Sequence, residues 1–595
     1  MSIVAHTVEL PSILTFEGLG DMYRSKALTP EAVVAGLIRR AAGDADRNIW
    51  IAGPSLEIAG PYLERLGSLD PDRYPLWGIP FAIKDNIDLA GVATTAGCPD
   101  YAYTPLSHAA AVERLIEAGA IPIGKTNLDQ FATGLVGTRS PYGETHNALR
   151  PELISGGSSS GSAVAVASGH CAFALGTDTA GSGRVPAALN GLVGFKPRLG
   201  AWPTEGVVPA CASLDCVSVF THALGDAALV DSVVRGYAAN DPWSRELPRL
   251  TPRVPSRICL PRETPQFFGP YAAEYEAAWL AAAERLTHMG LPVERIDTQL
   301  FDQAASILYD GPWIAERWAA LGPFVEAHPG SVHPVTERVL RSGASELHGA
   351  ADVFRAMHKL QHLRRQTAEL LADAVLVMPT TGGTWTREQL RADPVAANSA
   401  LGRYTNHCNL LDLGAIAVPA GNAAEGVPFG ITLFALAQDE GLAYEMGRLF
   451  VNGEEAAATI AASPPSPVES TLVAVCGLHM RGYPLEKQML GCGATFVREA
   501  RTAAKYQLLK LPTEPAKPGL IRLAEGGCAV ELELWEMPLA AFGGFAASIP
   551  APLGIGKVQL EDGAEVSGFI CEGFAAADAE DVTQYGGWRY LPTPR

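Results

Sequence analysis

Two glycine- and serine-rich segments carry the strongest chemical signal in the sequence. The first is SGGSSSGS at residues 155–162, and the second is GTDTAGSGRVPA at residues 176–187. Glycine lets a backbone approach a ligand closely, and small hydroxyl side chains cap helices. Because both segments lie among apolar stretches, we interpret them as site loops rather than as a flexible linker. Acyl transfer needs such a set: a nucleophile, a proton acceptor and donors for the oxyanion.

The proton acceptor is less obvious, because the sequence has no GxSxG elbow with the usual Asp and His behind it. His170 follows the first loop on an expected helix of small residues, so we expect it to pack rather than to catalyse. Lys84 is the better candidate, since it directly follows the apolar run IPFAI. Burial disfavours the ammonium form and lowers the pKa of a lysine, which makes the neutral amine available as a base.

Lys84, GGSSSGS and GTDTAGSGRVPA together resemble the amidase signature family over about residues 25–450. The spacings of 74 residues from Lys84 to Ser158 and of 24 residues from Ser158 to Ser182 agree with the family pattern. The resemblance implies a Ser–cis-Ser–Lys triad, with Ser182 as nucleophile, Ser158 as bridging serine and Lys84 as general base. It also implies a cis peptide bond between Gly157 and Ser158.

The same resemblance assigns an oxyanion hole to four consecutive backbone N–H groups, those of Thr179, Ala180, Gly181 and Ser182. We expect Asp178 and Arg184 to brace this loop. The family more often has GGSIR where this chain has AGSGR, so Ala180 and Gly183 depart from the common form. Both exchanges involve small residues and leave the implied mechanism intact.

Within the family, the sequence is most similar to the allophanate hydrolases. The similarity lies in LDQFATGLVGTRSPYG (128–143), in LYDGPWIAERW and in the extra domain after residue 470. It implies that the substrate is allophanate, a carboxylate joined to a urea-like amide, and that Tyr309, Arg317 and Gly134 bind it. An arginine fork binds a carboxylate through two parallel hydrogen bonds. We place Tyr309 and Arg317, eight residues apart, on one face of a single helix.

The elements that must position these groups alternate between short apolar strands and helices. Strand patterns occur at 76–89, 120–124, 374–378 and 415–419, and an amphipathic helix pattern occurs at 109–118. Such alternation favours an α/β domain with a covered sheet. We therefore expect an amidase-signature fold with a central mixed β-sheet flanked by helices.

Composition changes along the chain suggest its division into domains. We predict an amidase domain at 1–455 with a helical insertion at about 271–372, a Pro- and Ser-rich linker at 456–470, and a C-terminal domain at 471–595. The last domain is rich in strand patterns. It resembles the small β-barrel of γ-glutamylcyclotransferase-like proteins.

In this C-terminal domain, VCGLHMRGYPL (475–485) stands where the resembling fold has its ligand-binding loop. The amidase product of an allophanate hydrolase, N-carboxycarbamate, must lose carbon dioxide. His479 is a candidate aid to this decarboxylation. The alternative is that His479 is structural, that the domain supports assembly, and that decarboxylation proceeds unaided.

Composition and charge exclude several classes of protein. The chain has 595 residues, 48% of them hydrophobic, and a formal net charge of −19, so we expect a globular protein that avoids nucleic acid. It lacks a signal-peptide pattern, a membrane-spanning apolar run and a CxxC pair, which favours the cytoplasm and no membrane. His358 and His362 have a zinc-like spacing but do not form an HExxH motif, so we expect no metal. The sequence has no Walker or GxGxxG motif, so we expect no cofactor.

The leading hypothesis is ATP-independent hydrolysis of allophanate to ammonia and carbon dioxide, in the use of urea, biuret or cyanurate nitrogen. One alternative is another amidase, such as a biuret or aryl-amide hydrolase or an amidotransferase subunit. A second is a binding or assembly protein with an inactive amidase fold. The resemblance further implies a homodimer, and a urea carboxylase or a biuret or cyanurate hydrolase as pathway partner.

Overall fold

The computed structural model describes residues 10–309, 311–345, 349–453 and 470–592. The chain divides into two compact units, residues 1–463 and 464–595. The predicted linker at 456–470 lies outside the described residues, apart from its last residue.

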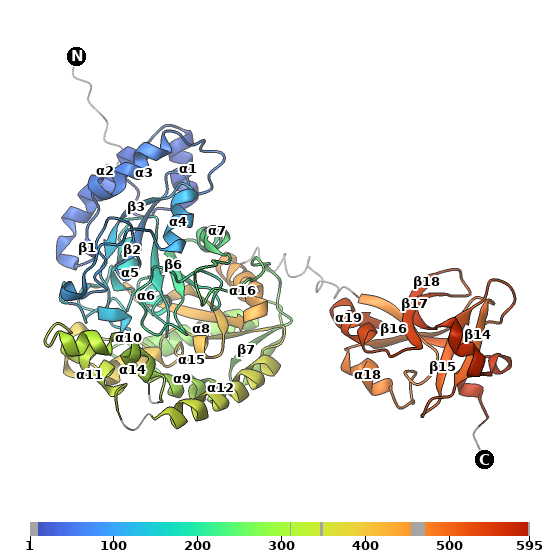
Figure 1. Ribbon diagram of the computed structural model, residues 1–595. Helices are drawn as coiled ribbons and strands as arrows, with labels where there is room; N and C mark the ends of the chain where they lie inside the picture. The colour runs from blue at the N-terminus through green and yellow to red at the C-terminus, as the bar shows by residue number, and fades with distance from the viewer. Residues whose placement is uncertain (1–9, 310, 346–348, 454–469, 593–595) are drawn as a thin grey trace. The chain divides into compact units, whose positions relative to one another are not determined.

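A large mixed sheet forms the centre of the first unit (Figure 1). Within the described residues it has eleven strands in the order β1-β3-β2-β4-β6-β5-β10-β11-β9-β7-β8. Strand β2 runs parallel to both β3 and β4, and β7 runs parallel to β8 and β9, whereas the other pairs are antiparallel. The strands are β1 (Trp50–Ala52), β2 (Pro80–Lys84), β3 (Ile121–Thr126), β4 (Phe173–Thr177), β5 (Val193–Lys196), β6 (Val217–Thr221), β7 (Arg257–Pro261), β8 (Val293–Ile296), β9 (Ala374–Pro379), β10 (Leu413–Ala424) and β11 (Val427–Leu436).

Helices flank this sheet, which confirms the predicted architecture. Helices α1 to α3 lie at one end of the unit in Figure 1, and α9 to α12 lie at the opposite end, within the predicted insertion at 271–372. The helices are α1 (Phe16–Arg24), α2 (Pro30–Gly43), α3 (Leu56–Leu66), α4 (Ala110–Glu117), α5 (Ser160–Ala167), α6 (Val185–Leu189), α7 (Leu224–Val234), α8 (Ala272–Thr287), α9 (Gln299–Tyr309), α10 (Ile314–Ala327), α11 (Pro334–Ser342), α12 (Ala350–Leu370), α13 (Arg387–Ala392), α14 (Ala396–Gly402), α15 (His407–Leu410) and α16 (Glu440–Asn452).

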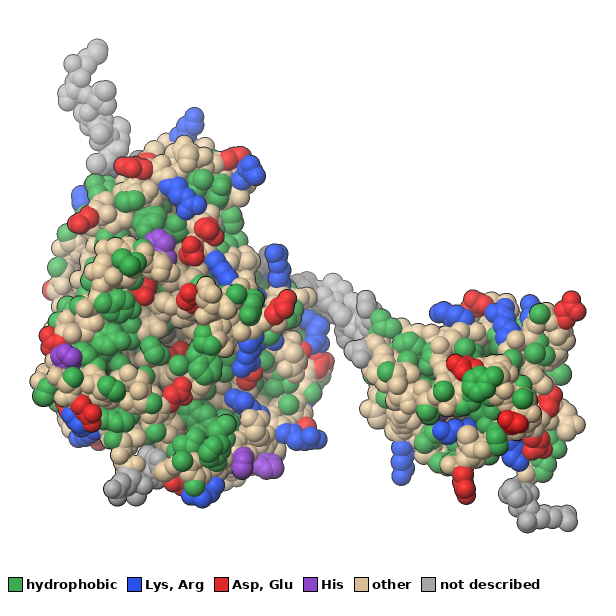
Figure 2. Space-filling model, viewed as in Figure 1, with side chains coloured by type: hydrophobic (Ala, Val, Ile, Leu, Met, Phe, Trp, Pro, Cys, Tyr) green, Lys and Arg blue, Asp and Glu red, His purple; other side chains and the backbone are tan. Residues whose placement is uncertain are grey.

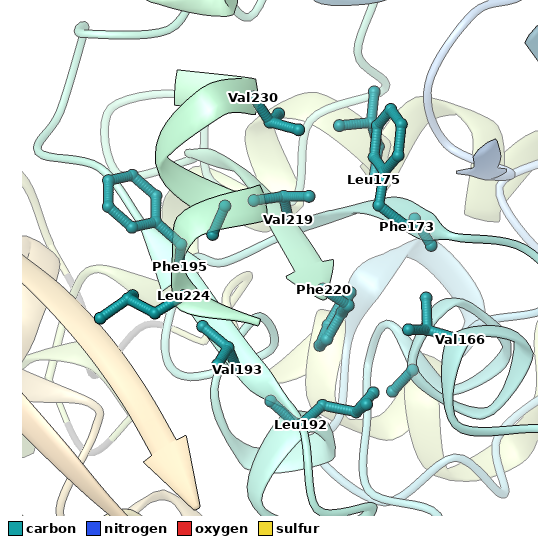
Figure 3. Packing of buried hydrophobic residues seen from close by; sticks show 14 of the residues in the cluster. Val166, Phe173, Leu175, Leu192, Val193, Phe195, Val219, Phe220, Leu224 and Val230 are labelled. Atoms are coloured by element: carbon teal, nitrogen blue, oxygen red, sulfur yellow. The ribbon is translucent and has the colours of Figure 1, made fainter. Parts of the chain in front are cut away.

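The central strands are buried on both faces, as their nearly continuous apolar sequences indicate. Every residue of β2, β4 and β6 is buried. Figure 3 shows Leu175, Phe195 and Val219 from neighbouring strands near Val230 of α7, all in one apolar cluster. This packed core gives the loops at the strand ends a rigid base.

The topology places candidate catalytic residues at the carboxyl ends of two central parallel strands. Strands β2 and β4 are adjacent and parallel, so their last residues, Lys84 and Thr177, lie at the same edge. The loop after β4 leads through Ser182 into α6, and Ser158 lies just before α5. Lys84 and Thr177, which are 93 positions apart in the sequence, therefore meet where these parallel strands end.

The second unit is rich in strands, as its sequence predicts. Its described strands form a five-stranded sheet, β13-β16-β12-β18-β17, and a three-stranded sheet, β15-β14-β19. The elements are β12 (Ser470–Val475), α18 (Glu486–Gly491), β13 (Thr495–Arg501), β14 (Tyr506–Leu511), β15 (Lys517–Arg522), β16 (Glu531–Pro538), α19 (Leu539–Ala547), β17 (Leu553–Gln559), β18 (Glu565–Cys571) and β19 (Glu580–Asp581).

The visible surface carries acidic and basic side chains side by side (Figure 2). The visible face of each unit is mixed in charge. Among the described residues, no helix is both long and apolar enough to cross a membrane.

Candidate active site

Lys84 ends strand β2 and is completely buried. Its Nζ lies 2.8 Å from Ser158 Oγ and 2.6 Å from Thr177 Oγ1, within hydrogen-bonding distance of both hydroxyls. The contact with Ser158 joins two residues that are 74 positions apart in the sequence. The structure thus brings together the predicted base and the predicted bridging serine.

The electrostatic surroundings of Lys84 favour a base. Burial lowers the pKa of Lys84 to about 7, although the nearby carboxylates of Asp129, Asp215 and Asp178 act to raise it. The Arg317 guanidinium adds to the lowering. A large fraction of Lys84 is therefore a neutral amine near pH 7, which is the protonation state that accepts a proton.

Ser158 is distinguished from its serine neighbours by its contacts. The peptide bond between Gly157 and Ser158 is cis. The Ser159 hydroxyl donates to the Thr177 carbonyl (3.2 Å), and Ser160 Oγ lies 3.0 Å from the Thr145 hydroxyl. Of these three serines, Ser158 is therefore the one whose hydroxyl contacts Lys84.

Ser182 lies in the loop between β4 and α6 and is 4% exposed. Its hydroxyl has no hydrogen bond to any described residue. The loop is held by Asp178, whose carboxylate accepts hydrogen bonds from the backbone N–H groups of Gly181 (2.7 Å) and Gly183 (3.1 Å). Ser182 is thus presented on a braced loop, and its hydroxyl is left unbonded by the described part of the protein.

Arg184 completes the brace, as expected for this pair. Its guanidinium donates to both carboxylate oxygens of Asp178, at 2.8 and 3.0 Å. Burial alone would raise the pKa of Asp178, but Arg184 and other donors outweigh it and hold this pKa below its usual value. The carboxylate therefore stays ionised and keeps the loop in place.

One of the four backbone N–H groups predicted for the oxyanion hole already has a hydrogen-bond partner in the structure. The N–H of Gly181 already donates to Asp178, so it is not a free donor in this structure. Within the part of the chain that the structure describes, the backbone N–H groups of Thr179, Ala180 and Ser182 have no partner. Their loop is fixed from the other side, because Thr405 Oγ1 donates to the Ala180 carbonyl (2.7 Å) and Asn409 donates to the Thr179 carbonyl (3.1 Å).

The departure at Gly183 has a local cause. A Cβ atom at this position would lie 2.5 Å from Ser218 Oγ, closer than real Cβ contacts allow. Any larger side chain would therefore have to displace β6 or the loop. Gly183 fits its surroundings without disturbing the Asp178 brace.

The prediction that Tyr309 and Arg317 share one helix is wrong. Helix α9 ends at Tyr309, and α10 begins at Ile314, so the two residues lie on different helices with a turn between them. Pro312 and Trp313 lie in a turn between the two helices. The eight-residue spacing therefore does not place Tyr309 and Arg317 on the same helix face. The side chain of Tyr309 lies outside the described part of the structure.

Arg317 is buried, with 1% of its surface exposed. Its Nη1 donates a hydrogen bond of 3.0 Å to Thr133 Oγ1. Its positive charge acts on the pKa values of both Lys84 and Asp215, so the guanidinium lies within electrostatic reach of the proposed base. Arg317 is therefore placed to meet an anionic group near Lys84.

Gly134 has a structural role that the sequence did not indicate. It has φ +157°, and a Cβ atom there would lie 2.7 Å from the Asp129 carboxylate. That carboxylate accepts hydrogen bonds from the backbone N–H groups of Val136, Gly137 and Arg139. A glycine at 134 thus makes room for Asp129, and its contact with a substrate stays a prediction.

In the second unit, His479 follows strand β12 and is 9% exposed. Its Nε2 lies 2.9 Å from Gln488 Oε1, and its ring stacks on Phe569 at 4.8 Å between centroids. Burial lowers the pKa of His479. The residue borders a cavity of about 130 Å³, whose other lining residues include Gln488, Lys517, Ser548, Leu553 and Phe569.

The other histidines that the sequence brings into question have ordinary surroundings. His170 is buried, lies 3.0 Å from Asp44 and stacks on Trp50, which confirms that it packs. His358 and His362 lie on α12. Among the described residues, no group of His, Cys, Asp or Glu side chains is arranged to hold a metal ion.

Three residues of this site were missed by reasoning from the sequence. Thr177 contacts Lys84, Thr133 contacts Arg317, and the backbone N–H of Asp129 donates to the Ser158 carbonyl (3.0 Å). Asp129 and Thr133 stand in a segment noted only for its resemblance, and Thr177 directly precedes Asp178. Only the position of Thr177 at the end of an apolar stretch could have suggested its role.

The sequence of each compact unit matches a known family. Residues 55–443 match the amidase family, and residues 471–592 match the allophanate hydrolase C-terminal domain. The first match spans more than half of the chain, so the chain belongs to the amidase family. The two matches together cover both compact units.

Among the individual proteins similar to this chain are two urea amidolyases and an allophanate hydrolase of known structure. The urea amidolyase of Saccharomyces cerevisiae is 41% identical over an alignment of 574 residues that covers 91% of this chain and 31% of that protein. The urea amidolyase of Lachancea kluyveri is 42% identical over an alignment of 546 residues that covers 87% of this chain and 30% of that protein. A solved structure of Kluyveromyces lactis allophanate hydrolase has a TM-score of 0.70 at 37% identity and covers 97% of this chain and 98% of its own. The chain spans about a third of the length of the urea amidolyases.

Proposed function

We propose that this protein is an allophanate hydrolase that releases ammonia and carbon dioxide without ATP. The observation that carries the proposal is the buried contact of Lys84 with Ser158, next to a loop that presents Ser182. The likeness to Kluyveromyces lactis allophanate hydrolase over nearly the whole of both chains supports the choice of substrate.

In the proposed mechanism, Ser182 Oγ attacks the amide carbonyl of allophanate. Ser158 accepts the Ser182 proton as it passes its own proton to neutral Lys84. The same relay returns a proton to the nitrogen as the C–N bond breaks and ammonia leaves. Water then attacks the acyl-serine by the reverse route, releasing N-carboxycarbamate.

The negative charge on the carbonyl oxygen needs donors that are already in position. We assign this role to the backbone N–H groups of Thr179, Ala180 and Ser182, which have no partner among the described residues, and not to Gly181. One such donor typically contributes about 3–4 kcal/mol to transition-state stabilisation. The Asp178–Arg184 brace keeps the donors in place before the substrate arrives.

The carboxylate of allophanate needs a positive partner, because the chain as a whole carries a net charge of −19. We assign Arg317 as that partner, with Tyr309 and Gly134 as further contacts. A buried guanidinium binds a carboxylate strongly, since little water competes for either group. The local charge of Arg317 thus offsets the repulsion by the distant acidic groups.

For the second unit, we propose that its cavity binds N-carboxycarbamate and that His479 aids the loss of carbon dioxide. The cavity next to His479 also has Lys517, Gln488 and Ser548 in its lining, which are suitable partners for an anion. In the alternative, His479 is structural, because its stacking on Phe569 and its bond to Gln488 also suit a packed residue.

Other activities are less well supported. A biuret or other small-amide hydrolase, or an amidotransferase subunit, would share the lysine and serines, but the match of residues 471–592 to the allophanate hydrolase C-terminal domain favours allophanate as the substrate. An inactive amidase fold that serves binding or assembly would not need Lys84 with a pKa of about 7 beside Ser158.

We further propose that the protein acts as a homodimer in the cytoplasm. All ten cysteines are free thiols, which suits a reducing compartment. A urea carboxylase, or a biuret or cyanurate hydrolase, would be the partner that supplies allophanate. Light scattering of the purified protein tests the homodimer, because a monomeric mass would contradict it.

The experiment that tests the function is ammonia release from allophanate, with biuret, malonamate and glutamine at equal concentration. We expect allophanate to have the highest kcat/KM and no ATP to be needed. Preferred turnover of biuret or glutamine would instead favour one of the alternative amidases. No turnover of allophanate would overturn the proposal.

A further inference from the structure

The segment 129–139 links two parts of the site that come from distant regions of the sequence. At its start, the backbone N–H of Asp129 donates to the Ser158 carbonyl, next to the Lys84 contact. Four residues later, Thr133 accepts a hydrogen bond from Arg317 of helix α10. One short segment therefore fixes the distance between the bridging serine and the guanidinium.

The Thr133 hydroxyl has a defined orientation. Its single proton is donated to the Phe131 carbonyl (3.1 Å), so the oxygen meets Arg317 Nη1 with a lone pair. The backbone of Thr133 is held as well, because Arg139 Nη1 donates to its carbonyl (3.0 Å). Thr133 is 1% exposed, so water does not replace these contacts.

The backbone before Thr133 is unusual. Phe131 and Ala132 both have left-handed conformations, with φ +54° and +52°, which residues with a Cβ atom rarely adopt. Such a conformation persists where the surroundings enforce it, often at functional sites. Here the Phe131 N–H donates to the Ala96 carbonyl, and the Phe131 ring packs edge-on against Phe324 at 5.8 Å between centroids.

Phe324 and Arg317 lie seven residues apart on α10, which is about two turns of one helix face. The segment 129–139 thus touches α10 at two points, through an aromatic contact and through Thr133. The aromatic contact ties the segment to the helix, and the Thr133 hydroxyl is one of the hydrogen-bond partners of the guanidinium.

We propose that Thr133 is a positioning residue that aims Arg317 at the carboxylate of the substrate and so sets the preference for carboxylated amides. This inference rests on the proposed function. Thr133 itself does not touch the reacting atoms. Its loss leaves the charge of Arg317 in place but removes one contact that orients the guanidinium.

The test compares Thr133→Val, which removes the hydroxyl at nearly constant volume, with Thr133→Ser, which keeps it. Thr367→Val is the matched control, since Thr367 is a buried threonine on α12 whose hydroxyl donates to a backbone carbonyl. The kcat and KM for allophanate are measured for each full-length protein. Calorimetry on the Ser182→Ala background gives the Kd of malonamate, which has a carboxylate, and of neutral malonamide.

We expect Thr133→Val to raise the KM for allophanate and the Kd for malonamate about tenfold or more, with kcat and any malonamide affinity within about twofold. Thr133→Ser restores both values to within about threefold, and Thr367→Val leaves them unchanged. If Thr133→Val does not fold, Thr133→Ala replaces it.

Unchanged malonamate affinity, equal losses for malonamate and malonamide, or failure of Thr133→Ser to restore binding would overturn the inference. Failure of the proposed function is a separate result, since it shows as absence of allophanate turnover by the wild type. In that case, the Kd of malonamate still tests whether Thr133 orients the Arg317 guanidinium.

Discussion

Thr177→Val tests how Lys84 is held in its proposed role as the base. In the wild type, Lys84 Nζ lies 2.6 Å from Thr177 Oγ1, and both side chains are buried. Valine has the same branched shape and suits the end of strand β4, so the fold is expected to persist. The substitution removes one hydrogen-bond acceptor and little else.

The magnitude follows from the loss of this partner. A buried donor left without an acceptor costs about 1–3 kcal/mol, which corresponds to a fall in kcat of about 5- to 150-fold if Lys84 loses its orientation toward Ser158. The Thr177 acceptor also favours the ammonium form of Lys84, because a charged donor gains more from it. Its removal therefore lowers the pKa of Lys84 further, and the acid limb of the pH–rate profile moves to lower pH.

The assay is ammonia release from allophanate between about pH 5 and 9, a range that brackets the Lys84 titration, for the wild type, Thr177→Val and Thr177→Ser. We expect a lower plateau and an acid limb at lower pH for Thr177→Val, and values within about threefold of wild type for Thr177→Ser. Wild-type kcat and an unmoved acid limb in Thr177→Val would refute the reasoning, as would equal losses in both variants.

Four further predictions concern separate parts of the protein. Burial lowers the pKa of Lys84 to about 7, and only the neutral amine accepts a proton. The kcat/KM of the wild type should therefore fall below pH 7 and reach about a tenth of its plateau at pH 6. An acid limb below pH 5 would contradict this assignment. Arg317→Ala should raise the KM for allophanate at least about tenfold while sparing neutral amides, and an equal defect for both classes would count against a carboxylate contact. Gly157→Ala would place a Cβ atom 2.1 Å from Asp129 Oδ2. Urea denaturation should therefore show a loss of about 1–3 kcal/mol in the free energy of unfolding. Unchanged stability would mean that the neighbouring atoms move aside without cost. His479→Ala should leave the first ammonia release within about twofold of wild type but let N-carboxycarbamate accumulate, as followed by carbon NMR; unchanged carbon dioxide release would favour a structural His479.

The fold was largely predictable because its strands are short and apolar. The strand patterns at 120–124 and 374–378 correspond to β3 and β9, and the helix pattern at 109–118 corresponds to α4. Periodicity does not give the pairing order, however. The eleven-strand order brings β10 between β5 and β11, and such long-range pairing depends on packing that a local pattern does not contain.

The site was predictable where a residue type has few alternatives. Lys84 was predictable as the lysine at the end of an apolar strand, whereas its partner Ser158 followed from the resemblance to the amidase signature family; the structure joins the two by a hydrogen bond. No local pattern reveals that Gly181 is already bonded to Asp178, because that bond depends on the folded loop. The turn between Tyr309 and Arg317 did have a sequence signal, because Gly311 and Pro312 lie between the two helices and such a pair interrupts a helix.

The central claim is that Ser182 attacks allophanate with the help of Ser158 and Lys84. Its most direct test is ammonia release from allophanate by the purified wild type and by Ser182→Ala, with circular dichroism to show that the variant is folded. We expect the wild type to release two ammonia molecules per allophanate without ATP, and Ser182→Ala to lose at least about a thousandfold in kcat. Turnover by folded Ser182→Ala at the wild-type rate would contradict the account.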